Sequence, residues 1–359
     1  HSDNAYLLEN ARIESHRLKT NTQSATAYRG FGGPQGMLGI ERVLDHIAHA
    51  LGRDPLDVRR VNYYAAMQDN AGASGGSLSG KMKPQTTPYG MEVEDFILHE
   101  MTDALEASSE YQARRAAVNE WNAKNTILKK GIALTPVKFG ISFTLTHLNQ
   151  AGALVHVYAD GSVHMNHGGT EMGQGLFQKV AQVAAARFGI DVADVKITAT
   201  DTGKVPNTSA TAASSGSDLN GMAVKAACDT IRDRLAAFLA ERHSIDAGDV
   251  IFADGKVKAG TETYSFAELA ALAYQNRISL SATGFYKTPK VAWDRIEGKG
   301  RPFFYFAYGA SVSEVVIDTL TGENRILRTD ILHDAGTSLN PALDIGQIEG
   351  GYVQGAGWL

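Results

Sequence analysis

The sequence predicts an α+β fold in which mixed sheets are partly covered by helices. Two observations support this prediction. Segments with the two-residue alternation of strands and segments with helical periodicity follow one another along the chain. The chain of 359 residues is also 43% hydrophobic and 20% charged, which allows a sizeable core in roughly two domains or one large one.

The first third of the chain is predicted to change from loop to helix. Residues 1–33 are expected to be extended, and a proline suits the first turn of a helix over 34–51. The apolar residues that recur there near helical spacing are Leu38, Val43, Leu44, Ile47 and Leu51. A second short helix begins near Pro55. The Gly-, Ser- and Pro-rich stretch 70–90 indicates a surface loop or boundary, and a helical stretch in two pieces follows at 91–124.

Strands are predicted from residue 131 onward. The segments 131–144 and 152–169 show β-rich alternation, and Asp160-Gly161 is a strong hairpin turn inside the second segment. A shorter strand is expected over 195–200. Two further strands are expected on either side of Thr321-Gly322.

Helices are predicted between these strands. The segments 176–189 and 218–243 have helical periodicity, and Ser265 suits the cap of a third helix. A glycine-rich helix follows Asn340. The single cysteine, Cys228, lies in the middle of a helix on its apolar face, so we expect it in the core.

Composition excludes several classes of function. A net charge of −5 argues against nucleic acid or an anionic membrane as the main partner. One cysteine excludes a disulfide scaffold, and also an iron–sulfur cluster held by this chain alone. No apolar run is long enough to span a bilayer, and we expect a cytoplasmic protein. The chain starts without Met and stops inside an apparent helix, so we expect both ends to be cuts through a fold.

Three turns rich in Gly, Ser or Thr each lead into a predicted helix. We call Gly168–Gly175 the glycine turn, Asn207–Ser217 the serine turn and Gly336–Gln347 the final turn. Free amide donors and the helix dipole make such turns suitable for anions. Helix capping is the commoner explanation of any single turn. Three such turns together favour one elongated polar ligand.

Side chains in the glycine turn argue against a triphosphate. The turn has neither the Gly-Lys-Ser/Thr ending nor the G-x-G-x-x-G spacing of the common phosphate loops, and Lys179 lies more than a turn inside the helix. Its prominent side chain is Gln174. An amide both donates and accepts, so it suits the edge of a heterocycle better than a phosphate. Met172 either packs on a flat ring or is an ordinary core methionine.

Metal-binding and nucleophile motifs are not apparent. His46 and His49 are three residues apart on a helix without a carboxylate pattern for zinc, and His164 and His167 flank a strand end. We interpret all four as surface histidines or as core histidines with satisfied hydrogen bonds. A hydrolase with a side-chain nucleophile has little support.

Two aromatic segments have two interpretations each. Phe31 lies among glycines, so it either stacks on a planar ligand or is buried in a tight turn. Phe139, Phe143 and Thr144 surround a strand end with the same ambiguity.

Six segments, in this order, resemble the molybdenum-binding part of the xanthine dehydrogenase family of molybdenum hydroxylases. They are residues 29–36, 138–154, 167–176, 205–221, 279–289 and 338–357. The resemblance covers almost the whole chain and is weakest at 70–90 and 243–262. It implies molybdopterin-binding domains of the molybdenum hydroxylase type. The chain is then an internal fragment of a bacterial-type subunit or domain. Residues 1–85 are the C-terminal part of the first molybdenum-binding domain, and residues 86–359 are most of the second, truncated at its C-terminal end.

The resemblance implies molybdopterin carrying molybdenum with oxo and sulfido ligands, and no protein side chain on the metal. It implies FAD and 2Fe-2S clusters on partner chains or domains, NAD as acceptor, and a dimer of heterodimers or a similar assembly. The implied cofactor-binding residues are Arg29, Met172, Gly173, Gln174, Thr211, Ala212, Ala213, Ser214, Ser215, Ser217 and Gln347. The backbones of Arg29 and Ala213 match positions near molybdenum. The implied substrate-binding residues are Phe31, Phe143 and Thr144.

The family chemistry is the oxidative hydroxylation of hypoxanthine and xanthine to urate, with oxygen from water. The resemblance puts the glutamate base downstream of Leu359, and the purine-binding glutamate and arginine upstream of His1. We therefore expect no catalytic base within these residues, a supporting role for Gln174, and no turnover by this chain alone. Two alternatives stay open: a hydroxylase of aldehydes or other N-heterocycles, and a non-catalytic nucleotide-binding assembly subunit.

Overall fold

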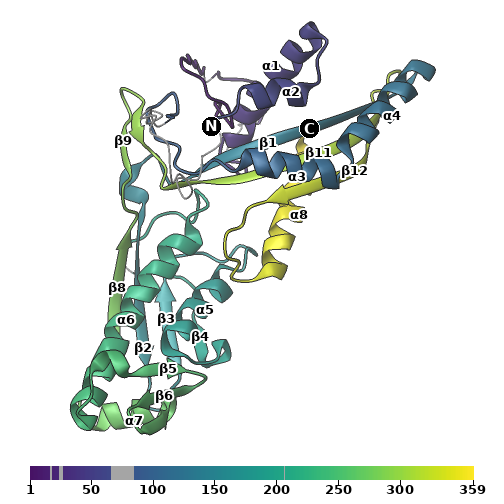
Figure 1. The fold of residues 1–359 in the computed structure, drawn as a ribbon. Helices are drawn as coiled ribbons and strands as arrows, with labels where there is room; N and C mark the ends of the chain where they lie inside the picture. The colour runs from purple at the N-terminus through teal and green to yellow at the C-terminus, as the bar shows by residue number, and fades with distance from the viewer. Residues whose placement is uncertain (17, 24–26, 66–84, 206) are drawn as a thin grey trace, which may run out of the picture. The chain divides into compact units, whose positions relative to one another are not determined.

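The computed structural model describes residues 1–16, 18–23, 27–65, 85–205 and 207–359 (Figure 1). The predicted α+β class is confirmed, because helices and mixed sheets are both extensive. The chain forms two compact units. The first comprises His1–Ile141 and Ala292–Gly336, and the second comprises Ser142–Val291 and Thr337–Leu359. The predicted domain border at residue 85 stays a prediction, and most of the predicted loop 70–90 lies outside the described residues.

The first unit is built on a long antiparallel sheet in the order β1-β11-β12. Its strands are β1 (Leu128–Ile141), β11 (Tyr305–Asp318) and β12 (Asn324–His333). Strands β1 and β11 pair over their full length, from Leu128↔Asp318 to Ile141↔Tyr305. A small hairpin joins β9 (Ala292–Asp294) to β10 (Lys299–Arg301). The predicted strand pair about Thr321-Gly322 is confirmed as β11 and β12.

Helices accompany this sheet in the described part of the first unit (Figure 1). They are α1 (Gly33–Leu51), α2 (Pro55–Val61), α3 (Leu98–Ser108) and α4 (Tyr111–Lys124). The two predicted pieces of the 91–124 stretch are present, but its first residues are not helical. Met91, Val93 and Phe96 are buried in an extended segment, and Thr86 bridges Glu92. Alternating burial therefore overrides the helical prediction before Leu98.

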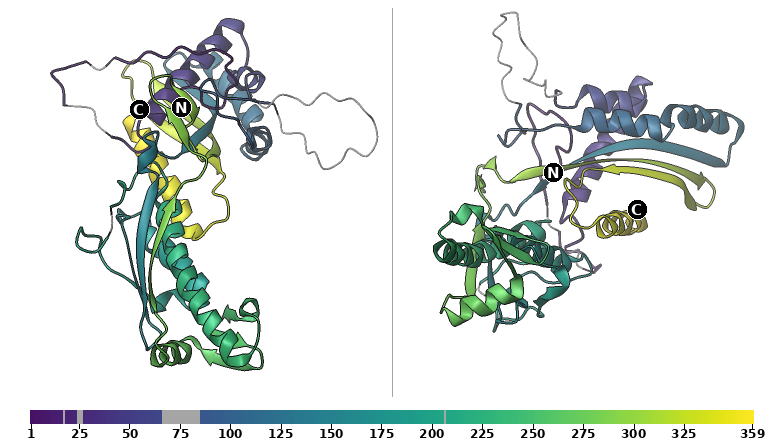
Figure 2. Two further views of the ribbon diagram at one scale, coloured as in Figure 1. Left: turned by 90° about the vertical axis from the view of Figure 1, so that its left-hand side faces the viewer. Right: turned by 60° about the horizontal axis from the view of Figure 1, so that its bottom comes forward.

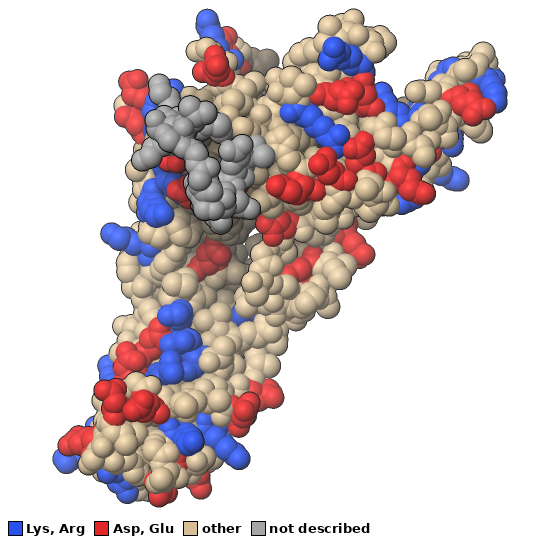
Figure 3. Space-filling model, in the orientation of Figure 1, with Lys and Arg blue, Asp and Glu red and all other residues tan. Residues whose placement is uncertain are grey.

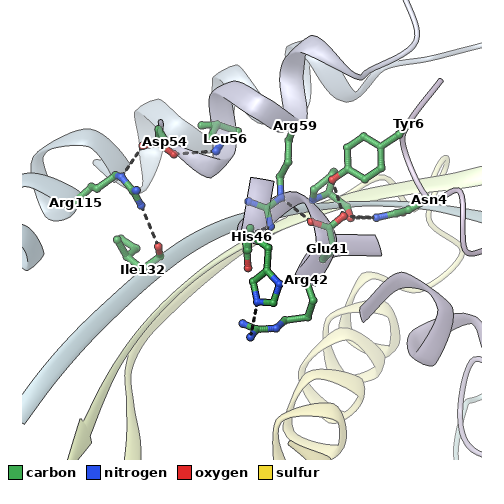
Figure 4. Close-up of polar contacts among 12 residues, drawn as sticks. Asn4, Tyr6, Glu41, Arg42, His46, Asp54, Leu56, Arg59, Arg115 and Ile132 are labelled. Carbon is green, nitrogen blue, oxygen red and sulfur yellow. Dashed lines mark hydrogen bonds and ion pairs between the residues drawn. The ribbon is translucent and has the colours of Figure 1, made fainter. Parts of the chain in front are cut away.

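A buried ionic network joins α1 to α2 in the first unit (Figure 4). Arg59 is fully buried; its Nε donates to Glu41 (2.6 Å) and its Nη2 to Asp45 (2.7 Å). Glu41 also accepts from Tyr6 Oη (2.6 Å) and Asn4 Nδ2 (2.8 Å). Burial first, and then the Glu41 charge, raise the pKa of the Tyr6 phenol above its ordinary value. The core-facing side of α1 thus carries a paired carboxylate among its apolar residues.

The second unit contains a mixed sheet in the order β4-β3-β2-β8. Its strands are β2 (Gln150–Val157), β3 (Val163–His167), β4 (Val195–Ile197) and β8 (Ser281–Lys287). Strands β3 and β4 pair in parallel and the other pairs are antiparallel. The hairpin turn predicted at Asp160-Gly161 joins β2 to β3, with Gly161 at φ 84°. A separate small sheet has the order β5-β6-β7, with strands β5 (Ile251–Ala253), β6 (Lys256–Ala259) and β7 (Glu262–Ser265).

Helices pack on the four-stranded sheet of the second unit (Figure 2). This unit contains α5 (Leu176–Phe188), α6 (Gly216–His243), α7 (Phe266–Gln275) and α8 (Pro341–Trp358). Helix α6 lies close to β8 because Gly284 has no side chain; a Cβ there would lie 2.0 Å from Ala223 O. Cys228 is fully buried on α6, as predicted. The predicted cap of α7 is also confirmed, as a capping box of Ser265 and Glu268.

No helix within the described ranges is long and apolar enough to cross a membrane.

Candidate functional site

The three predicted turns come together in the second unit. The glycine turn and the serine turn are joined where the Thr170 N–H donates to Thr211 Oγ1 (2.9 Å). From the final turn, Gln347 Nε2 reaches Gly173 O at 3.5 Å. Tertiary structure therefore places side by side three segments that are far apart in the sequence, as one elongated polar ligand would require.

Close approach between the first two turns depends on glycine. A Cβ on Gly168 would lie 2.3 Å from Thr208 Oγ1, and one on Gly169 would lie 2.7 Å from Asn220 Nδ2. Real side chains do not tolerate such distances, so a larger residue at Gly168 would displace Thr208 of the serine turn, and one at Gly169 would displace the side chains of Leu176 and Asn220.

The glycine turn contains an anion of its own. Glu171 Oε1 accepts the N–H groups of Gly173 (2.8 Å) and Gly175 (3.0 Å). Its Oε2 accepts the N–H of Phe177 in the first turn of α5 (3.0 Å). Burial opposes ionisation, but these backbone donors outweigh it and hold the pKa of the Glu171 carboxyl below its usual value. The α5 amides that the sequence offered to an external anion are thus partly used by the chain itself.

Gln174 is held within the same turn. Its Oε1 accepts the Met172 N–H (2.6 Å), and its Nε2 donates to Thr170 O (2.9 Å). A carboxamide has two N–H donors and two acceptor lone pairs, so these bonds leave capacity for a ligand. Met172 is 65% exposed, which rules out its interpretation as a core methionine.

His167, the last residue of β3, immediately precedes the glycine turn and departs from the prediction. The Gly169 N–H donates to His167 Nδ1 (3.0 Å), so the proton of the neutral ring is on Nε2. That Nε2 is buried without a hydrogen-bond partner among the described residues, and burial lowers the pKa of the imidazole to about 4. The prediction of a surface or satisfied core histidine is wrong here, because tertiary packing buries Nε2 where it has no acceptor among the described residues. His46 and His49 are exposed and His164 is half-buried.

The serine turn ends in strained backbone at the start of α6. Ala213 and Ser214 both have φ 56°, in the left-handed region that non-glycine residues rarely occupy. Such positions cost about 1–3 kcal/mol each and persist where the surrounding structure requires them. The N-cap residue, Ser215, forms no side-chain cap bond with α6. The first amides of this long helix therefore receive no side-chain bond from their N-cap residue.

A small pocket lies behind the serine turn. Its lining residues are Gln150, Ala151, Thr208, Ser209, Ala210, Thr211, Ala212, Ser215, Gly216, Leu219 and Asn220. The volume is about 10 Å³, roughly the size of a site for one water molecule. Asn220 Nδ2 donates to Gly216 O (2.8 Å), while its buried Oδ1 has no hydrogen-bond partner in the part of the chain that the structure describes. Asn220, one of the lining residues, therefore keeps a free acceptor atom in its amide.

The final turn is capped by its own side chains. Asn340 Oδ1 accepts the Leu343 N–H at the start of α8 (3.2 Å). Asp344 in the first turn of α8 binds Lys179 of α5 (2.9 Å). Lys179 therefore ties two helices together, which agrees with its exclusion from a phosphate loop. At the start of α6, by contrast, the N-cap residue forms no side-chain bond with the helix, and the first turn contains the carboxylate of Asp218.

The remaining site residues divide between the units. In the second unit, Thr144 is exposed, and the Phe143 backbone is held by Asn149, which accepts from Phe143 N–H and donates to Phe143 O (2.8 Å each). In the first unit, Arg29 and Phe31 are exposed. Phe31 is 76% exposed with φ 46°, so its interpretation as a buried residue is wrong. Phe139 instead stacks on the His1 ring (4.3 Å).

Three supporting residues escaped the sequence argument: Glu171, Asn149 and Asn220. An acid just before a helix is a known capping signal, so Glu171 was the one open to prediction.

Within the described parts of the chain, no group of three or more His, Cys, Asp or Glu side chains is placed to hold a metal ion. On the face drawn in Figure 3, acidic and basic side chains are interspersed.

Comparisons with known proteins agree with this geometry. Profiles of the molybdopterin cofactor-binding domain match residues 1–63 and 104–359. The chain is 46% identical to the xanthine dehydrogenase/oxidase of Gallus gallus over 99% of its length, and 46% identical to the xanthine dehydrogenase of Oryza sativa subsp. japonica over 100%. It spans 24% of the length of each. Quinoline 2-oxidoreductase from Pseudomonas putida 86 has the same fold, with a TM-score of 0.73, 24% identity, and coverage of 90% of this chain and 40% of that one.

Proposed function

We propose that this chain, which belongs to the family of molybdopterin cofactor-binding domains, is the cofactor-binding part of a xanthine dehydrogenase. The reaction would be the oxidative hydroxylation of hypoxanthine and xanthine to urate. The observation that supports this proposal is the meeting of the three turns in the second unit, through Thr170–Thr211 and Gln347–Gly173. Similarity to two xanthine dehydrogenases over 99% and 100% of this chain supports the choice of substrate class.

The residues of the second unit fit a cofactor with a polar ring system and an anionic tail. The serine turn offers strained backbone and the α6 amides, which suit the anionic tail. Gln174 and Gln347 offer carboxamides, which suit the hydrogen-bonding edge of a heterocycle. We assign Met172, Gly173, Gln174 and Gln347 to one part of the cofactor and Thr211–Ser215 and Ser217 to the other.

When bound, the molybdenum cofactor would supply the oxidation and the oxygen transfer. The chain's own residues would orient it and hold the substrate. Gln174 would direct an uncharged amide toward the metal end, and Phe143 and Thr144 would contact the substrate. Arg29 and Phe31 of the first unit belong to the same proposal through their match to family positions.

Partners belong to the proposal as well. Because the chain spans 24% of its curated relatives, we propose that 2Fe-2S clusters, FAD and the catalytic glutamate lie in polypeptide outside these residues. NAD would be the electron acceptor, in a cytoplasmic hetero-oligomer. The buried thiol of Cys228 leaves no cysteine here for cluster binding.

Molybdenum and pterin analysis of the purified protein in its full form tests the proposal. We expect one molybdenum and one oxidisable pterin per copy of this chain, and urate from xanthine with NAD as acceptor. If the protein turned over aldehydes or quinoline but not xanthine, the proposed substrate class would have to be changed to those compounds. Absence of molybdenum and pterin would refute the proposal.

The variant Gln174→Ala sharpens the test. We expect it to lower turnover per bound molybdenum by about 10²-fold, in the range for removal of one preorganised donor. Gln178→Ala, an exposed glutamine on α5, is the matched control and is expected to keep wild-type turnover. Equal turnover for Gln174→Ala and wild type would remove Gln174 from the site.

A further inference from the structure

The glycine turn is organised around a single carboxylate. The Glu171 carboxylate accepts hydrogen bonds from the backbone N–H groups of Gly173, Gly175 and Phe177, which lie two, four and six residues further along the chain. The turn folds around this side chain as P-loops fold around a phosphate. The lowered pKa of the Glu171 carboxyl keeps it ionised, and an ionised carboxylate with three amide partners is a poor proton acceptor.

Gln174 lies between two of the residues whose N–H groups donate to Glu171. Its neighbours Gly173 and Gly175 have φ 94° and 73°, a backbone that Glu171 stabilises by accepting both of their N–H groups. The Gln174 carboxamide itself is hydrogen-bonded to the turn, at Met172 N–H and Thr170 O. The direction of the amide therefore depends on the shape of the turn, and that shape depends on the carboxylate.

We infer that Glu171 is a positioning residue that holds the glycine turn, and through it Gln174, in a fixed orientation toward the ligand. The role of Gln174 in this inference rests on the proposed function. The dependence of the turn on Glu171 does not, so the two parts are tested by different measurements.

The isosteric variant Glu171→Gln separates shape from charge. One atom of the new amide still accepts, but the other becomes a donor that faces the Phe177 N–H or the glycine amides. In the protein in its full form, we expect hydrogen exchange over residues 172–177 to be about tenfold faster, the result of losing one charge-assisted bond. Glu171→Asp keeps the charge and the short reach to Gly173 but cannot reach Phe177, so we expect faster exchange there as well. Unchanged exchange in both variants would overturn the inference.

Glu268→Gln provides the matched control. Glu268 also caps a helix N-terminus, accepts backbone and hydroxyl donors from Ser265, and has a lowered carboxyl pKa from those bonds. It belongs to α7, and we expect its variant to change exchange near residue 265 while leaving 172–177 unchanged. Faster exchange at 172–177 in this control would show a global effect and overturn the local explanation.

A double-mutant cycle tests the link to Gln174. We expect Glu171→Gln to lower turnover per bound molybdenum about tenfold at unchanged KM, because the lost interaction acts on the reacting complex. In a Gln174→Ala background the same change should cost nothing further. Additive losses would overturn the link. If the protein contains no molybdenum, the proposed function fails, and the exchange experiment still decides whether Glu171 holds the turn.

Discussion

The N-termini of α5 and α6 lie in the same unit, follow turns of similar composition, and differ in what satisfies their amides. At α5, Glu171 accepts the Phe177 N–H and two glycine amides of the preceding turn. At α6, Ser215 forms no side-chain cap, and Ala213 and Ser214 are strained. The comparison teaches that a helix N-terminus binds an external anion only after the chain's own acceptors have been counted. On that basis we propose that α6 receives the anionic tail and that the glycine turn forms the side that carries Gln174.

The largest expected effect is the pH dependence of stability that comes from His167, next to the glycine turn. The folded-state pKa of His167 is about 4, below the ordinary value of 6.5, because the ring is buried. The unfolded chain therefore binds the proton first, and stability is lost as pH falls from 6.5 toward 4. We expect a loss of about 3 kcal/mol in the free energy of unfolding from this group. Urea unfolding at pH 7 and pH 4 measures it.

His167→Asn isolates this contribution. Asparagine keeps an acceptor near the position of Nδ1 for the Gly169 N–H but does not titrate, so the pH-dependent loss should shrink by about the same amount. His164→Asn, on the same strand, is the control and should keep the wild-type dependence. An unchanged dependence in His167→Asn would show that another group is responsible.

The next effect concerns the strained start of α6. Ser214→Val places a β-branched residue at φ 56°, and Ser244→Val does the same at φ 55° at the other end of the same helix. We expect each to lower the free energy of unfolding by about 2 kcal/mol. Only Ser214→Val should lower the amount of molybdenum bound per folded chain. We expect a fall to about a tenth, which corresponds to a loss of about 1.4 kcal/mol in binding free energy. Equal molybdenum content in the two variants would contradict the assignment of α6.

The smallest effect concerns the link between α5 and α8. Lys179 and Asp344 are mostly shielded from solvent, so Lys179→Met should cost about 1 kcal/mol of unfolding free energy. Lys225→Met removes a more exposed pair with Asp229 within α6 and should cost about half as much. Thermal or urea unfolding of both variants gives the comparison. A smaller cost for Lys179→Met would indicate that α8 is held by other contacts.

Much of the fold was predictable, because local patterns determine it. The turn at Asp160-Gly161, the cap at Ser265 and the strand pair about Thr321-Gly322 each have a local chemical signal. The helix predicted from residue 91 begins at Leu98, because burial of Met91 and Val93 in an extended segment depends on distant neighbours. Periodicity over seven residues does not distinguish these outcomes.

The candidate site was predictable in its segments but not in its contacts. The three turns were identified from composition, yet nothing local showed that Thr170 would bind Thr211 or that His167 Nε2 would be buried without a partner. Likewise, Val43, Ile47 and Leu51 follow helical spacing but lie exposed on α1, while Glu41 is buried there with Arg59. Which side chains pair depends on tertiary structure. A charged residue such as Glu41 can therefore be buried where the sequence pattern predicts an apolar one, and apolar residues such as Val43 can be exposed.

A crystal structure of the purified protein in its full form, with anomalous scattering measured at the molybdenum edge, tests the central claim most directly. We expect the anionic tail of the cofactor on the amides at the start of α6, the metal end beside Gln174, and Glu171 still bound to Gly173, Gly175 and Phe177. An anionic tail on the α5 amides, with Glu171 displaced, would contradict the account.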